Sequence, residues 1–100
     1  MGIDKDLRSV IEKLHQQKPL LVEKYKLESM GIFGSFVRHE RKTSSDLDLL
    51  VSFVEPPSLL TFIEMENYLT DLLGVRVDLV MQEALKPRIG RQILKELMPI

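Results

Sequence analysis

The segment from residue 46 to residue 81 places a long helix between two strands, and this order constrains the fold more than any other feature. Residues 46–54 contain an apolar run typical of a strand, and residues 75–81 alternate apolar with charged side chains. Between them, residues 58–73 carry apolar side chains at helical spacing, with Ser58 suited to an N-cap and Gly74 to a C-terminal stop. A long helix between two strands favours a crossover connection, so we expect a mixed or parallel sheet.

The remaining segments add helices and one more strand. We expect a first helix at 4–16, a short second helix from Pro19 to residue 25, a strand at 27–33, one or two helical turns at 35–40, and a last helix from Pro87 to about residue 97. The chain has 100 residues, which corresponds to a single domain spanning 1–100. The predicted class is therefore α+β, a small mixed β-sheet with helices packed mainly on one face.

Composition limits the classes of partner and compartment. A net charge of −1 provides no general attraction to nucleic acid or to an anionic membrane, so we expect no direct nucleic-acid binding. The absence of cysteine excludes disulfides and thiolate metal sites. No apolar stretch approaches the roughly 20 residues of a membrane span, and the first residues do not form a signal peptide. We therefore expect a soluble cytoplasmic protein without membrane contact.

Acidic side chains at the start of the 46–54 strand are the strongest candidates for chemistry. Asp46 and Asp48 project from the same side of a strand because successive side chains point to opposite faces. Two carboxylates roughly 6–7 Å apart repel each other, and a shared divalent cation would turn that repulsion into a binding site. The crossover could bring Asp78 beside them. Each aspartate could instead be a solvated residue at an exposed strand end.

A Gly-Ser turn precedes these aspartates. Gly34 and Ser35 follow the 27–33 strand, and a glycine at such a turn allows the backbone to approach a phosphate closely. Ser35 could cap the following helical turn, bind a phosphate oxygen, or do both. Arg38 could contact phosphate or pair with a carboxylate.

Together these residues resemble the motif of the minimal nucleotidyltransferase family, which is part of the DNA polymerase β-like superfamily. The family pattern is a Gly-Ser turn, an Arg-Gly pair, a Ser-Asp-x-Asp motif and a third acidic residue on a later strand. The matching residues of this chain are Gly34, Ser35, Arg38, Ser45, Asp46, Asp48 and Asp78. The resemblance extends over the whole chain, with one departure: His39 stands where the family usually has glycine.

The resemblance implies a fold, a reaction and a partner. It implies the nucleotidyltransferase fold and two Mg²⁺ ions held with bound nucleotide by Asp46, Asp48 and Asp78, which would also be the catalytic residues. It assigns nucleotide contacts to four residues, Gly34, Ser35, Arg38 and Ser45. The family member would be the antitoxin of a toxin–antitoxin pair, transferring AMP from ATP to a tyrosine of a HEPN ribonuclease toxin and thereby neutralising it.

Two other functions remain open at this stage. The chain could be a nucleotidyltransferase subunit that modifies a small molecule such as an aminoglycoside, with a partner supplying the acceptor pocket. It could also be a catalytically weak antitoxin that acts by binding alone, an alternative that His39 keeps open. A chain of this length has little material for both a nucleotide pocket and an acceptor pocket. We therefore expect the protein to act in a complex, as a hetero-oligomer or a homo-oligomer.

Overall fold

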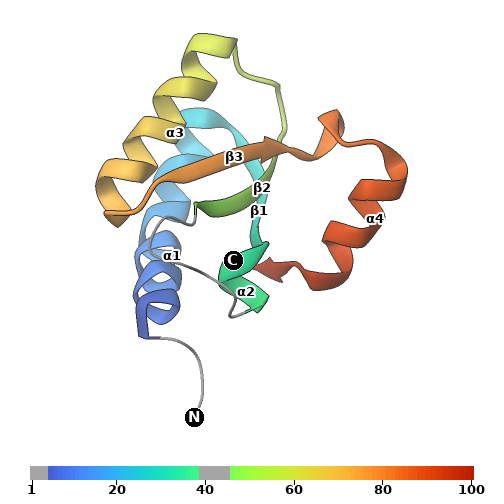
Figure 1. Cartoon of the computed structure of the whole chain (residues 1–100). Coiled ribbons are helices and arrows are strands. Elements are labelled where there is room, and N and C mark those ends of the chain that lie inside the picture. The colour runs from blue at the N-terminus through green and yellow to red at the C-terminus, as the bar shows by residue number, and fades with distance from the viewer. Residues whose placement is uncertain (1–4, 39–45) are drawn as a thin grey trace.

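The computed structural model describes residues 5–38 and 46–100 of the chain (Figure 1). His39 and Ser45, two residues named from the sequence, lie outside the described residues. In chain order the elements are α1 (Lys5–Tyr25), β1 (Leu27–Phe33), α2 (Ser35–Arg38), β2 (Leu47–Phe53), α3 (Leu59–Leu73), β3 (Val77–Met81), a 3₁₀ turn η1 (Gln82–Ala84), α4 (Pro87–Glu96) and β4 (Met98–Pro99).

The strands form one mixed sheet in the order β3-β2-β1-β4. β2 and β3 are parallel and are connected by α3, whereas β1 runs antiparallel to both β2 and β4. Ser58 caps α3 by accepting a hydrogen bond from the Thr61 amide, and Gly74 ends the helix in the left-handed conformation with φ 72°. The mixed sheet and its crossover helix are thus confirmed.

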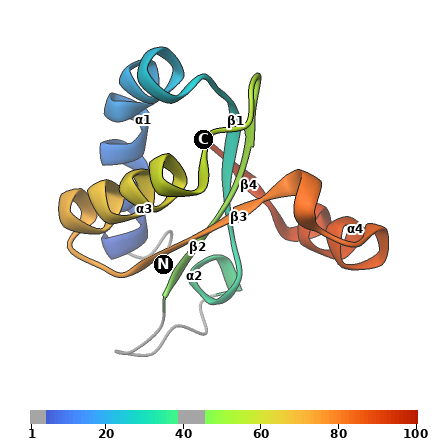
Figure 2. The same cartoon turned by 90° about the horizontal axis from the view of Figure 1, so that it is seen from above.

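The hydrophobic core lies between the sheet and two helices. Figure 2 shows α1 and α3 together on one side of the sheet, while α4 extends from the opposite side. Leu47, Leu49 and Val51 of β2 are fully enclosed, as expected for a central strand. In contrast, none of the ten residues of α4 is buried. The prediction of helices mainly on one face is confirmed, with α4 as the exception.

One helix replaces the two helices expected at 4–16 and 19–25. Pro19 lies inside α1, although proline removes a backbone donor and usually breaks a helix at a cost of about 3 kcal/mol. Leu7, Leu14 and Leu21 are spaced by seven residues, and each exposes at most 1% of its surface. Each buried leucine contributes roughly 1.5–3 kcal/mol. The continuous apolar stripe therefore offsets the local cost of Pro19, and the two-helix prediction is wrong.

The C-terminal residues form a short strand that the sequence did not reveal. Met98 and Pro99 pair with Ile32 and Gly31 of β1. Leu97 lies directly over Gly31, where a Cβ atom would come within 2.7 Å of the leucine side chain. This pairing anchors the end of α4 beside β1 and α2. Within the part of the chain that the structure describes, no helix has the length and apolar character needed to cross a membrane.

Candidate active site

The parallel pairing of β2 and β3 brings two of the predicted aspartates together. Asp48 is the register partner of Asp78, so the two side chains leave the sheet from the same face. Asp46 lies immediately before β2, two residues from Asp48. The structure thus gathers the three aspartates that the sequence singled out at one end of the β2–β3 pair.

The ionised form of Asp48 is unfavourable in its surroundings. Burial is the main cause that raises its pKa from 3.8 to about 6, followed by the negative charges of Asp78 and Asp46. Arg38 acts in the opposite direction, and a side-chain hydrogen bond with Asp78 raises the pKa further. Burial and the neighbouring negative charges therefore favour a proton on Asp48. A divalent cation could take the place of that proton.

Magnesium suits this donor set. The ion usually takes one or two protein carboxylates together with substrate phosphates, rather than a complete protein cage. In keeping with that, no three His, Asp or Glu side chains in residues 5–38 and 46–100 are arranged to hold a metal ion by themselves. The adjacent carboxylates of Asp48 and Asp78, with the pKa of Asp48 raised, fit a hard cation whose coordination is completed by a nucleotide.

Asp48→Asn is expected to stabilise the metal-free protein at pH 8 and to have little effect at pH 4. The raised pKa means that the folded state holds the proton more tightly than the unfolded state, so wild-type stability falls as the pH rises from about 4 to about 6. Asparagine carries no charge at any of these pH values. Because Asp48 is only partly buried, we expect a gain on the order of 1 kcal/mol at pH 8.

Thermal melting in EDTA at both pH values measures this effect. A gain of about 1 kcal/mol would raise the melting temperature by roughly 4–8 °C. Asp71→Asn, the same change on the exposed surface of α3, serves as the control and should show no comparable gain. An equal gain at pH 4 and pH 8 would contradict the assignment of an unfavourable charge to Asp48.

The Gly-Ser turn lies directly against Asp48. Gly34 has a φ of 83°, a left-handed conformation that favours glycine, and its carbonyl accepts hydrogen bonds from the amides of Val37 and Arg38 at 3.1 Å. A Cβ atom on Gly34 would collide with Oδ2 of Asp48. Glycine is therefore required here both by the backbone conformation and by the carboxylate beside it. Ser35, the next residue, is half-buried at the start of α2.

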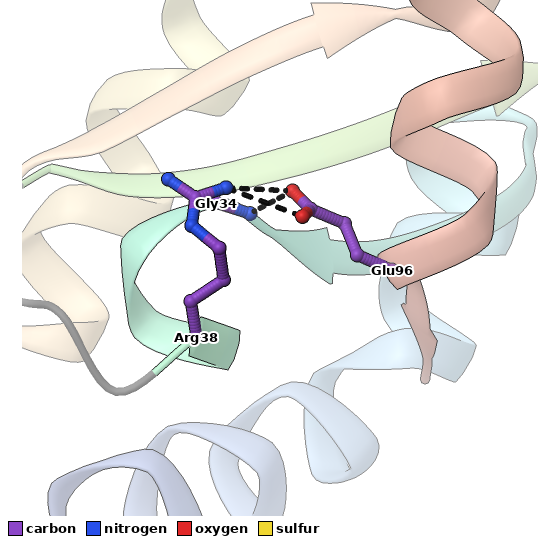
Figure 3. A network of polar contacts seen from close by, with 3 residues as sticks. All are labelled: Gly34, Arg38 and Glu96. Carbon is purple, nitrogen blue, oxygen red and sulfur yellow. Dashed lines mark hydrogen bonds and ion pairs between the residues drawn. The ribbon is translucent and has the colours of Figure 1, made fainter.

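Glu96 joins this turn from the other end of the chain. Its Oε1 accepts a hydrogen bond from the Gly34 amide at 3.0 Å (Figure 3). Arg38 Nη1 donates to Oε1 at 3.0 Å and to Oε2 at 3.2 Å. The pairing of Arg38 with a carboxylate, one of the two roles left open, is thus observed, and the carboxylate is Glu96.

Sequence reasoning missed Glu96, although one weak signal existed. Glu96 ends α4, and a negative charge at a helix C-terminus is unfavourable, so this position normally favours Lys or Arg. An acid there suggests a role other than helix stability. Its partners, however, are 58 and 62 residues away in sequence, and no local pattern connects them.

A pocket of about 260 Å³ opens between the Gly-Ser turn and α4. The residues that line it come from β1, α2, β2 and α4, and they are Phe33, Gly34, Arg38, Asp48, Ile89, Gln92, Ile93 and Glu96. The sheet and α2 therefore contribute Asp48 and Arg38 to the pocket, while α4 contributes apolar side chains together with Glu96. Asp46, Asp78 and Ser35 lie outside this lining, although Asp78 contacts the pocket residue Asp48.

Comparison with known proteins identifies the family. The sequence model of the family described as nucleotidyltransferase domain matches residues 14–99 of this chain. The chain belongs to this family. It is 45% identical to the putative protein adenylyltransferase MJ1217 of Methanocaldococcus jannaschii, over 96% of this chain and 99% of that protein. It is also 49% identical to the protein adenylyltransferase MntA of Thermococcus cleftensis, over 90% of this chain and 91% of that protein.

Solved structures agree that the chain has the fold of a minimal nucleotidyltransferase. A putative minimal nucleotidyltransferase superposes with a TM-score of 0.82 at 36% identity, over 99% of this chain and all of that one. The same fold occurs in a complex described as a tri-AMPylated Shewanella oneidensis HEPN toxin with its MNT antitoxin, with a TM-score of 0.61 at 20% identity, over 94% of this chain and 67% of that chain. The prediction of a nucleotidyltransferase fold and enzyme class is confirmed.

Proposed function

We propose that this minimal nucleotidyltransferase is the antitoxin of a toxin–antitoxin pair and transfers AMP from ATP, in the presence of Mg²⁺, to a tyrosine of a HEPN ribonuclease toxin. The observation that carries the proposal is the pairing of Asp48 with Asp78 beside the Gly34 turn, because it sets carboxylates for a metal next to backbone and guanidinium donors for phosphate. The 49% identity to a protein adenylyltransferase called MntA supports the protein acceptor.

The charges of the site match magnesium-bound ATP. Asp46, Asp48 and Asp78 would hold the metal, which when bound neutralises phosphate charge and orients the leaving pyrophosphate. The Gly34 amide and the Arg38 guanidinium line the same pocket as Asp48 and would donate to phosphate oxygens. Ser35 and Ser45 remain proposed nucleotide contacts. A carboxylate site for a cation beside amide and guanidinium donors for an anion favours a ligand such as magnesium-bound ATP, which contains both a metal ion and phosphates.

The reaction needs an acceptor hydroxyl and a group to receive its proton. The tyrosine oxygen would attack the α-phosphorus of ATP, the bond to the pyrophosphate oxygen would break, and the tyrosine proton would pass to a carboxylate. Asp78 is proposed for that role because it is the register partner of Asp48 and brings a second carboxylate to the site. Its side chain is exposed at the edge strand β3, where an acceptor from another protein has access.

Co-expression with the product of the adjacent gene tests this function. The complex, incubated with magnesium and ATP, should give a toxin whose mass has increased by one or more adenylyl groups, and fragmentation should place them on tyrosine. Ribonuclease activity of the modified toxin should be lost. Rapid modification of an aminoglycoside without any protein partner would instead favour the small-molecule transferase, and stable binding with neither modification would favour a binding-only antitoxin.

A further inference from the structure

Glu96 occupies the donors that a phosphate would need. Two oxygens of its carboxylate engage the Gly34 amide and the Arg38 guanidinium, with three donor–acceptor distances between 3.0 and 3.2 Å. Backbone amides and guanidinium groups are also the usual donors to phosphate oxygens. A carboxylate is itself an anion with two acceptor oxygens. Figure 3 shows this carboxylate facing both Gly34 and the Arg38 guanidinium.

The contact opposes the binding of a second anion in either of two ways. If Glu96 stays in place, its negative charge lies within a few ångströms of any phosphate at the turn, and like charges at that distance repel. If Glu96 leaves, the phosphate must replace its hydrogen bonds to Gly34 and Arg38. The glutamate side chain is only 27% exposed, so solvent screens its charge less than that of a surface residue.

The Glu96 side chain can leave the turn while the pairing of β4 with β1 keeps the end of α4 in place. No residue of α4 is buried, so rotation of the Glu96 side chain does not disturb the hydrophobic core. The pocket beneath α4 holds about 260 Å³, which is less than the 300–1,000 Å³ typical of ligand sites. Rotation of the Glu96 side chain away from the turn would expose the Gly34 amide and the Arg38 guanidinium to a phosphate and enlarge this pocket at the same time.

We propose that Glu96 is an internal anionic ligand that holds the phosphate-binding donors of Gly34 and Arg38 in the nucleotide-free protein and competes with the triphosphate of ATP for them. This inference rests on the proposed nucleotidyl transfer and adds a regulation of the same site. ATP, which carries more negative charge than one carboxylate, displaces the Glu96 side chain from the two donors.

Calorimetric titration with magnesium-ATP tests the competition. Glu96→Gln keeps the shape and the acceptor oxygen of the side chain but removes its charge, so it should bind ATP about tenfold more tightly than wild type. Glu83→Gln makes the same change of net charge on the exposed turn η1, outside the pocket, and should bind like wild type. Equal or weaker binding by Glu96→Gln than by Glu83→Gln would overturn the proposal.

Glu96→Asp separates competition from simple support of the turn. Aspartate keeps the charge but is one methylene shorter, so its carboxylate withdraws from the Gly34 amide, and binding several-fold tighter than wild type is expected. The ¹H–¹⁵N signal of Gly34 should also shift at lower tripolyphosphate concentrations in either Glu96 variant. Weaker ATP binding by Glu96→Asp than by wild type would show that Glu96 positions the donors instead, and would overturn the proposal. If Glu96→Gln fails to fold, the affinity of Glu96→Asp alone tests the competition.

The same titrations distinguish failure of this inference from failure of the proposed function. Wild-type protein that binds magnesium-ATP while neither Glu96 variant gains affinity would reject the competition and leave nucleotidyl transfer intact. If neither wild type nor any variant binds magnesium-ATP, both nucleotidyl transfer and the competition built on it are rejected.

Discussion

Asp48→Asn is expected to lower the rate of adenylyl transfer by about a thousandfold or more, because loss of one preorganised charge-stabilising group typically costs 10²–10³-fold and a metal ligand contributes at least as much. Asp48 is central to the site: it pairs with Asp78, lies against Gly34 and lines the pocket. Labelled ATP, magnesium and the cognate partner provide the measurement. Asp46→Asn and Asp78→Asn should show losses in the same direction.

The variant must be shown to be folded, and its own stability provides that control. Asp48→Asn should melt at a higher temperature than wild type in EDTA at pH 8, so loss of transfer could not be attributed to unfolding. Asp71→Asn, the matched change on the exposed face of α3, should retain wild-type transfer. Transfer by Asp48→Asn at the wild-type rate would remove Asp48 from the catalytic site.

Gly34→Ala is expected to destabilise the protein by about 3 kcal/mol and to abolish nucleotide binding. Roughly 1–2 kcal/mol comes from placing a side chain at a φ of 83°, and the rest from the collision of the new methyl group with Oδ2 of Asp48. A loss of this size lowers the melting temperature by about 12 °C or more in a domain of this length. Thermal melting and ATP titration measure the two effects.

Gly74→Ala is a matched control for the backbone term. Gly74 has a similar φ of 72°, but among the described residues no atom beyond its two chain neighbours lies within 4 Å of the position that a Cβ would take. This variant should therefore lose only about 1 kcal/mol and should bind ATP like wild type. If the two variants are destabilised equally, the close approach of Gly34 to Asp48 does not contribute to the loss of stability in Gly34→Ala.

Local patterns in the sequence were sufficient for most elements. The strand β1 follows from its apolar residues. The boundaries of α3 follow from apolar periodicity and from Ser58 and Gly74, whose capping hydrogen bonds reach only three or four residues along the chain. Asp46 and Asp48 could likewise be placed on one face, because the two-residue period of a strand is a local property. Pro19 shows the limit of such reasoning: its local tendency to end a helix is outweighed by leucines that pack against the distant sheet.

Only the tertiary structure decided which distant groups meet. The sequence offered Asp78 as a candidate, but the parallel register of β2 and β3 placed it opposite Asp48, where burial first and the charge of Asp78 second raise the pKa of Asp48. Glu96 could not be assigned to the site at all, because it reaches Gly34 through β4 pairing and the direction of α4. Periodicity and capping depend on neighbours a few residues apart, whereas a site depends on charges brought together across the whole chain. For this protein the sequence determined most of the elements and the candidate site residues, whereas the continuity of α1 through Pro19, the strand β4 and the electrostatic partners of Asp48 and Arg38 depend on packing between distant segments.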